Sequence, residues 1–229
     1  MTIEDVKKID DLVKVQRALI SVSNKNGLEY FVPELLKINP DMEIISTGGT
    51  YNKIKDEILD KKSEENLTLV SDYTGQPETK GGLVKTLDFK IYLGILTETY
   101  NEDHQKDLKR TGAKPIDMVI CSLYDFEEII EKAGVTPEMA RGRIDIGGSC
   151  MIRASAKNYP RVISIVNPRD YNRVLNVLRS YDGCTPLEFR ASLVEEAFRH
   201  ASEYDAIIAN YMARTPFAAI KNAYPEIKN

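Results

Sequence analysis

Two short apolar runs near the start of the chain are each followed by a polar turn and a helical pattern. The first run covers residues 17–23, and apolar side chains then recur three and four positions apart over residues 28–36. The second run covers residues 43–46 and leads through the turn 47–50 into another helical segment. Strand, turn and helix in repetition predict a doubly wound, mostly parallel sheet of the α/β class.

The remaining pattern extends this architecture to the end of the chain. Further strands are predicted over residues 67–70, 91–96, 115–121 and 162–166. Helices are predicted over residues 1–17, 98–110, 167–178 and 187–212, with a short one that begins at Thr136 and Pro137. No internal repeat or low-complexity linker is visible. We therefore expect one domain over residues 1–229, with residues 1–16 as an N-terminal extension and residues 160–229 as a helical closure.

The stretch 144–158 combines a glycine pair with charged residues and small side chains. Gly147 and Gly148 predict a loop whose N–H groups turn toward a ligand, and Asp145 precedes a helix of small residues. Lys157 lies about three turns further on, in a segment of low polarity, so we expect it to be half-buried and its pKa to be tuned. An acid, N–H donors and such a lysine suit proton transfer. A buried helix with an Asp cap and a Lys that reaches solvent is the alternative that spacing leaves open.

Hydroxyls, glycines and a lysine follow the first two predicted strands. Because ligands bind at the carboxyl ends of the strands in such sheets, these turns predict a phosphate site. Its candidate residues are Ser21, Ser23, Lys25, Thr47, Gly48, Gly49 and Thr50. A second glycine pair, residues 81–82, precedes Lys85 and Thr86, and this segment is a further candidate for anion binding.

Composition narrows the classes of function. A net charge of −4 argues against general nucleic-acid binding. Three widely spaced cysteines form no disulfide motif, so a reducing, cytoplasmic setting is expected. These cysteines also form no metal motif, and with only two histidines in the chain a zinc site is improbable. No apolar run approaches the roughly 20 residues of a membrane span, and the N-terminus lacks a secretory signal.

Six motifs in one order resemble a known family. They are residues 18–25 (ALISVSNK), 46–50 (STGGT), 71–75 (SDYTG), 84–87 (VKTL), 122–126 (SLYDF) and 144–158 (IDIGGSCMIRASAKN). Together they resemble the IMP cyclohydrolase domain of the bifunctional purine-biosynthesis enzyme that also carries an AICAR formyltransferase domain. The resemblance covers nearly all of residues 17–212. It implies the methylglyoxal-synthase-like fold, a homodimer, and a stand-alone cyclohydrolase module for which a separate formyltransferase is a candidate partner.

The resemblance also implies a reaction and a set of site residues. The reaction is closure of 5-formamidoimidazole-4-carboxamide ribonucleotide (FAICAR) to IMP with loss of water, without metal or organic cofactor. By motif match, Lys85 contacts the formyl oxygen, Asp145 and Lys157 handle protons, and Tyr124 lies beside the base. The Gly147 and Gly148 amides would supply oxyanion donors. The remaining substrate-binding residues implied are Ser21, Ser23, Lys25, Thr47, Gly48, Gly49, Thr50, Thr86 and Ser122.

Several residues depart from the family pattern. Leu83 replaces an arginine, Asp88 and Phe89 replace a His-Pro pair, and Asp125 replaces a proline. A lost cation and two added acids predict a less positive pocket rim and weaker binding of an anionic nucleotide. The alternative function is therefore a divergent nucleotide-binding or sensing module on the same fold. Methylglyoxal synthase shares the fold, but this chain lacks the catalytic His and Asp set that it needs.

Overall fold

The computed structural model describes residues 5–77, 79, 84–224 and 226. Its central layer is a five-stranded sheet in the order β4-β3-β2-β5-β6, with every neighbouring pair parallel. The strands are β2 (Arg17–Val22), β3 (Glu43–Ser46), β4 (Leu67–Leu69), β5 (Met118–Ser122) and β6 (Ile163–Ile165). The predicted doubly wound α/β class is confirmed, and all five strands lie at or close to predicted strand positions.

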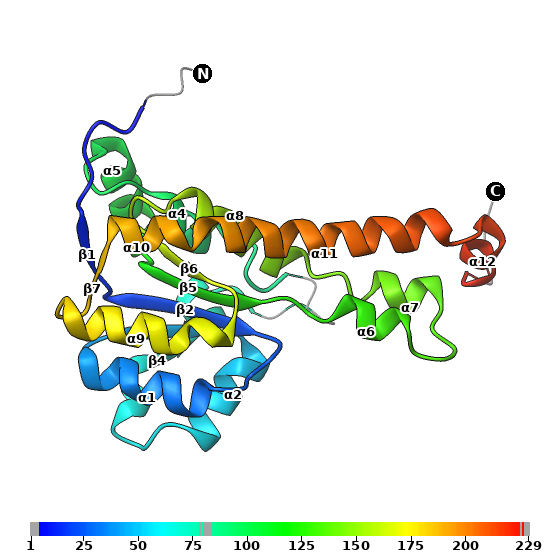
Figure 1. The fold of residues 1–229 in the computed structure, drawn as a ribbon, viewed down its shortest axis with the longest axis horizontal. Coiled ribbons are helices and arrows are strands. Elements are labelled where there is room, and N and C mark those ends of the chain that lie inside the picture. Colours follow the sequence, from blue (N-terminus) through cyan, green and yellow to red (C-terminus); the bar gives the residue numbers. More distant parts are fainter. Residues whose placement is uncertain (1–4, 78, 80–83, 225, 227–229) are drawn as a thin grey trace.

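Helices cover both faces of the sheet (Figure 1). One face carries α1 (Leu28–Ile38), α2 (Gly48–Glu57) and α9 (Tyr171–Ser180). The other carries α4 (Phe89–Leu96), α8 (Ile146–Lys157) and α11 (Val194–Arg214). The shorter helices are α3 (Val70–Thr74), α5 (Glu102–Thr111), α6 (Phe126–Ile130), α7 (Pro137–Arg141), α10 (Leu187–Ser192) and α12 (Phe217–Asn222), and 3₁₀ turns cover Ser63–Asn66 and Pro168–Asp170.

Strand β2 shows why the sheet is buried on both sides. Ala18 and Ile20 point into the core beneath α1 and α9, while Leu19 between them points into the core beneath α8. All three are fully buried. Side chains alternate across a strand, so a strand covered on both faces is apolar throughout. Burial of a Leu or Ile side chain such as Leu19 or Ile20 contributes roughly 1.5–3 kcal/mol. The covered faces leave only the two ends of the strands for polar chemistry.

The described part of the N-terminal segment is extended, so the predicted helix over residues 1–17 is wrong. Its strand β1 (Leu12–Lys14) pairs antiparallel with β7 (Cys184–Pro186), a strand that the sequence did not predict. The fully buried Arg190 donates to the carbonyls of Asp10 (2.9 Å) and Asp11 (3.0 Å). A guanidinium has five N–H donors that need acceptors when buried, and the extended segment supplies two of those acceptors.

The predicted strand at residues 91–96 is also wrong, because this segment forms α4. Asp88 caps it by accepting the Lys90 N–H at 2.7 Å. The run is apolar at every position, so its periodicity does not separate strand from helix. The structure buries Ile91 and Ile95, four positions apart, against α8.

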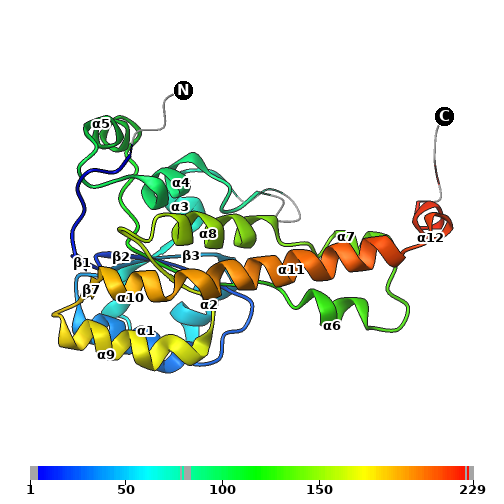
Figure 2. The same cartoon turned by 45° about the horizontal axis from the view of Figure 1, so that its top comes forward.

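The long C-terminal helix is interrupted once. Instead of one helix over residues 187–212, α10 ends at Ser192, and α11 begins at Val194. The Ser192 hydroxyl donates to the Phe189 carbonyl at 2.8 Å, a local bond that competes with the helical ladder. Beyond the sheet, α11 extends into an arm that also carries α6, α7 and α12 (Figures 1 and 2). The predicted cap of α7 is confirmed, with Thr136 as N-cap and Pro137 first in the helix.

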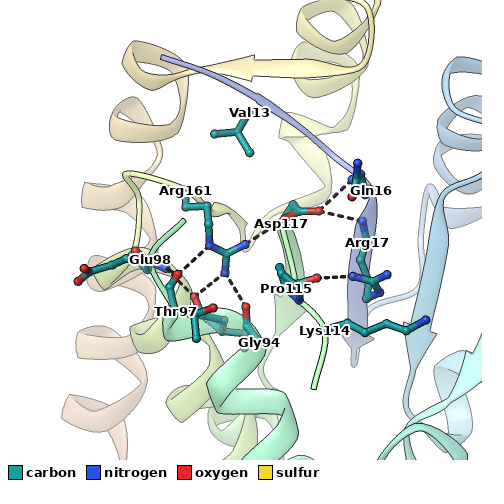
Figure 3. A network of polar contacts seen from close by, with 12 residues as sticks. Val13, Gln16, Arg17, Gly94, Thr97, Glu98, Lys114, Pro115, Asp117 and Arg161 are labelled. Atoms are coloured by element: carbon teal, nitrogen blue, oxygen red, sulfur yellow. Dashed lines mark hydrogen bonds and ion pairs between the residues drawn. The ribbon is translucent and has the colours of Figure 1, made fainter. Parts of the chain in front are cut away.

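The amino ends of the strands are closed by a network of charged groups (Figure 3). Asp117, just before β5, accepts from Arg161 at 2.9 Å and from the main-chain N–H groups of Gln16 and Arg17. The Arg161 guanidinium also donates to main-chain carbonyls at the end of α4, including Thr97 at 2.8 Å. Both Asp117 and Arg161 are buried. Here side chains bond mainly to the backbone, so this end of the sheet is a structural junction.

Candidate functional site

The carboxyl ends of β3, β2 and β5 lie side by side and gather most of the predicted site. In register, Ile20 lies opposite Ser46 on one side, and Val22 lies opposite Ser122 on the other. Helix α8 runs back between β5 and β6, so it begins at this same edge. The turns after the three strands and the first turn of α8 therefore meet around one region, as expected for an open α/β sheet.

The turns after β2 and β3 are joined by hydroxyl groups. Ser21 Oγ lies 2.9 Å from Thr47 Oγ1. The buried Thr50 hydroxyl donates to the Val22 carbonyl (3.1 Å) and accepts the Val22 N–H (3.2 Å). Because both roles of this hydroxyl are filled by the backbone, Thr50 locks α2 against β2. Only its main-chain N–H remains for the predicted phosphate contact.

The first turn of α2 is open toward a ligand. Thr47 is its N-cap, but the Thr47 side chain accepts no N–H of the helix. A Cβ placed on Gly49 would meet no atom within 4 Å. The first N–H groups of a helix lack partners within it and carry the positive end of its dipole. The Gly48–Gly49 turn thus offers N–H groups and space together, the combination that a phosphate requires.

Serine hydroxyls also join the turns after β2 and β5. Ser23 Oγ donates to the Leu123 carbonyl at 2.5 Å and lies 3.3 Å from Ser122 Oγ. The Ser122 hydroxyl accepts the Ser23 N–H at 3.0 Å. Lys25, in the same turn, places its ammonium 3.4 Å from the Ser23 carbonyl. The structure thus brings Ser21, Ser23, Lys25, Thr47 and Ser122 to one edge.

Lys85 and Thr86 reach this edge from the segment before α4. Lys85 lines a narrow crevice together with Thr47. Thr86 is buried, and a Cβ on Gly147 would lie 2.5 Å from its Oγ1 atom. That separation is too short for any side chain, so glycine at 147 permits α8 to approach Thr86. Leu83 and residues 81–82 lie outside the described residues.

Asp145 is fixed at the start of α8 by three features. Its Oδ1 atom accepts the Gly148 N–H at 2.7 Å, and its own N–H donates to the Tyr204 hydroxyl at 2.7 Å. A Cβ on Gly148 would lie 2.6 Å from the Asp145 Oδ2 atom, so the glycine makes room for the carboxyl group. Burial raises the pKa of the Asp145 carboxyl above its ordinary value, and the bond from Gly148 opposes that rise. A carboxyl of this kind can exchange a proton nearer neutrality.

The prediction of a loop at Gly147 and Gly148 is wrong, because both residues belong to the first turn of α8. The reason is the Asp145 cap, which starts the helix before Gly147. The Gly148 N–H already bonds the Asp145 carboxylate, so it is directed away from the predicted oxyanion role. Any such role falls to Gly147, whose Cα faces Thr86.

Tyr124 lies beside the site on the exposed loop after β5. Its side chain lines a cavity of about 680 Å³ together with Ser23 and Arg143. Asp125 and Asp88, two of the departures from the family pattern, are helix caps: Asp125 accepts the Glu128 N–H at 2.9 Å, and Asp88 caps α4. Their carboxylates are therefore engaged by helix amides, which weakens the argument that they repel a nucleotide.

Lys157 is not half-buried as predicted but exposed, at the last residue of α8. It lies twelve residues from Asp145, which is about 18 Å along a helix. Arg153, four positions earlier, is exposed as well, so both side chains belong to the solvent face of α8. Within one chain, Lys157 lies toward the amino ends of the strands, away from the other predicted site residues.

Three residues near the site were not predicted from the sequence. They are Tyr204, Arg143 and Tyr92. Burial raises the pKa of the Tyr92 hydroxyl, which has no hydrogen-bond partner among the described residues. Tyr92 lies within an apolar run and Tyr204 follows the helical spacing of its neighbours, so the sequence pattern marks neither as a site residue.

Among the described residues, no group of three His, Cys, Asp or Glu side chains is arranged to hold a metal, and no helix is both long and apolar enough to cross a membrane.

Comparisons with known proteins match most of this chain. The MGS-like domain family matches residues 27–150, and the family described as AICARFT/IMPCHase bienzyme matches residues 155–228. A bifunctional purine biosynthesis protein PurH of Thermoanaerobacter sp. (strain X514) is 47% identical over 86% of this chain and 37% of its own length. The protein of that name from Bacillus subtilis (strain 168) is 41% identical, with the same coverage. The chain thus spans little more than a third of these relatives.

A solved structure described as "Crystal structure of ForH" matches at comparable length. It has a TM-score of 0.72 and 31% sequence identity, and the match covers 85% of this chain and 97% of that one. The fold is therefore shared with a protein of similar size as well as with part of the longer relatives.

Proposed function

Since this chain belongs to the MGS-like domain family and continues into a segment of the AICARFT/IMPCHase family, we propose that it acts in purine biosynthesis as an IMP cyclohydrolase. The observation that carries the proposal is the meeting of Asp145, Thr86 and the Ser21–Thr47 pair at one sheet edge. Relatives at 41–47% identity are named as bifunctional purine biosynthesis proteins, which supports the pathway.

The proposed reaction closes a ring within one molecule. The carboxamide nitrogen of FAICAR attacks the formyl carbon, the formyl oxygen becomes the hydroxyl of a tetrahedral intermediate, and that hydroxyl leaves as water to give IMP. Because both reacting groups belong to one substrate, the main task of the protein is to hold them in contact. It must also stabilise negative charge on the formyl oxygen and move two protons to that oxygen: one from the carboxamide nitrogen, which makes the hydroxyl, and one from the formamide nitrogen, which lets the hydroxyl leave as water.

In this proposal, Asp145 is the proton carrier and Lys85 contacts the formyl oxygen. A partly buried carboxyl with a raised pKa can accept the carboxamide proton and pass it to the formyl oxygen. The same carboxyl can then carry the formamide proton to the leaving hydroxyl. The Gly147 N–H is the proposed second oxyanion donor, and Tyr124 contacts the base. The 5′-phosphate and ribose are assigned to Ser21, Ser23, Lys25, Thr47, Gly48, Gly49, Thr50, Thr86 and Ser122. Lys157 stays a hypothesis drawn from the family motif.

The decisive experiment mixes purified protein with FAICAR and follows IMP by absorbance. Turnover that disappears in Asp145→Asn supports the cyclohydrolase. Parallel calorimetry with IMP distinguishes the cyclohydrolase from the alternative function. Nucleotide binding without turnover would identify a binding or sensing module. Absence of both would remove purine nucleotides as ligands.

We also propose a homodimer, as the family resemblance implies. The arm presents apolar side chains that suit an interface, including Met139 (57% exposed), Met212 (47%) and Phe217 (77%). Light scattering at micromolar protein is expected to give twice the 25.9 kDa chain mass. A separate formyltransferase is the proposed source of FAICAR, whether or not it binds this chain.

A further inference from the structure

Helix α11 reaches the start of α8 through one tyrosine. The Tyr204 hydroxyl accepts the Asp145 N–H at 2.7 Å, across 59 positions of sequence. Its side chain is only 6% exposed. The Asp145 N–H precedes the helix, so no helical carbonyl accepts it, and a buried N–H without an acceptor is unfavourable. The hydroxyl therefore determines where the backbone of Asp145 can lie.

The Tyr204 ring is itself held by the loop on the other side of the site. It packs edge-on against Phe126, with centroids 6.3 Å apart and planes at 73°. Phe126 is the first residue of α6, and Tyr124 precedes it by two positions. Tyr204 thus contacts both segments that flank the proposed reaction centre: the loop after β5 through its ring and the start of α8 through its hydroxyl.

We propose that Tyr204 is a positioning residue for ring closure, holding the Asp145 backbone so that its carboxyl faces the substrate. This rests on the cyclohydrolase function proposed above. With the N–H anchored by Tyr204 and Oδ1 anchored by the Gly148 N–H, the carboxyl has only Oδ2 left for the substrate. Displacement of a reacting group by about 1 Å can lower a rate by roughly 100-fold, so a backbone anchor of this kind affects turnover.

The chain contains a matched control on the same helix. Tyr211, two turns further along α11, also packs edge-on against Phe126, at 5.8 Å and 84°. Among the described residues its hydroxyl has no hydrogen-bond partner, and the Thr215 hydroxyl donates to the Tyr211 carbonyl instead. Tyr204→Phe and Tyr211→Phe therefore both keep the aromatic contact and both remove a hydroxyl, but only Tyr204→Phe removes the acceptor of the Asp145 N–H.

The test compares kcat, KM and amide exchange in the two variants. Tyr204→Phe is expected to lower kcat about 10- to 100-fold while KM stays within about twofold, because the phosphate and ribose contacts are untouched. Tyr211→Phe is expected to behave as the wild type. In hydrogen-exchange NMR, the Asp145 amide should lose protection in Tyr204→Phe alone.

The outcomes separate this inference from the proposed function. An active wild type with equally active Tyr204→Phe would overturn the positioning role and leave the cyclohydrolase standing. An inactive wild type would overturn the proposed function and, with it, the role in ring closure; exchange would then still report whether Tyr204 anchors the backbone. Equal Asp145 protection in all three proteins would show that Tyr204 anchors nothing. Similar melting temperatures of both variants would confirm that each is folded.

Discussion

The two ends of the parallel sheet are both polar, but they use their polar groups in opposite ways. At the amino ends, Asp117 and Arg161 bond to each other and to the backbone, and both are buried. At the carboxyl ends, Ser21 pairs with Thr47, and the Lys25 ammonium lies 3.4 Å from the Ser23 carbonyl. Hydroxyl pairs and a half-buried ammonium can be rearranged around a ligand at little cost, whereas a charged network bonded to the main chain cannot.

This difference separates a junction from a site on one small sheet. The junction fixes the α4–α8 layer on β5, and α8 transmits that position over its length to Asp145 at the other edge. Stability should therefore depend on the amino edge, and ligand binding and turnover on the carboxyl edge. Each prediction below tests whether the two properties can be separated.

The largest effect is expected on stability from Arg161→Met. Loss of this guanidinium leaves the buried Asp117 carboxylate without its ion-pair partner, so the free energy of unfolding should fall by about 3–5 kcal/mol. Urea denaturation measures the change. Arg169→Met, which breaks an exposed pair with Glu196, is the control and should change stability by less than about 1 kcal/mol. Comparable losses of unfolding free energy in both variants would mean that the buried Asp117–Arg161 pair stabilises the fold no more than an exposed ion pair does.

The next effect is on turnover, from Asp145→Asn. Asparagine also caps helices, so the free energy of unfolding should change by less than about 1 kcal/mol, while kcat falls about 100-fold or more. Asp88→Asn, an equivalent change at the cap of α4, serves as the control and should retain activity. A fall in stability that accounts for the lost activity would remove Asp145 from catalysis.

The pH profile sharpens the same prediction. Burial raises the pKa of the Asp145 carboxyl, and a base must be ionised to accept a proton. In the wild type, kcat should therefore decline on the acid side through a pKa above the value of about 3.9 for an ordinary Asp. An acid-side decline of kcat with a pKa at or below that value would contradict the role of the buried Asp145 as the base.

A smaller effect is expected on binding from Lys25→Ala. Removal of one ammonium from the turn after β2 should weaken IMP binding by about 1–3 kcal/mol, and added salt should reduce the difference. Lys53→Ala on α2 removes a lysine that is paired with Glu57, and it should leave IMP affinity unchanged. Calorimetry that finds equal affinity for wild type and Lys25→Ala would place the phosphate elsewhere.

Sequence patterns were sufficient to locate the five strands of the parallel sheet along the chain, and they predicted that the candidate site lies at the carboxyl ends of these strands. Apolar runs followed by polar turns predict where the strands lie along the chain, and parallel strands bring their turns together whatever the exact packing. The α4 segment was misjudged because an unbroken apolar run carries no period. Tyr204 could not have been found, because its contact with Asp145 depends on how α11 crosses the fold. The exposure of Lys157 could have been predicted from the sequence. Arg153 and Lys157 are four positions apart, so they lie on the same face of the helix, and two cations on one face indicate a face in solvent.

The smallest expected effect is the coupling between Asp145 and Lys157. The sequence hypothesis treats them as a unit, so that a double variant would be little worse than either single one. In the structure they occupy opposite ends of α8, about 18 Å apart, and Lys157 is exposed. Residues that are so far apart and share no partner usually contribute independently, with a coupling energy below about 0.5 kcal/mol.

A double-mutant cycle on kcat decides between these views. If the two residues act separately, the fold-loss of the Asp145→Asn, Lys157→Ala double variant should equal the product of the two single losses. The loss from Lys157→Ala alone should be small, since this ammonium reaches neither Asp145 nor the turns after β2 and β3 within one chain. A large single loss with strong non-additivity would require a second chain to bring its own Lys157 to this edge. The carboxyl-edge site would then be complete only in the dimer, and the contrast between the two edges would hold for the assembly rather than for the single chain.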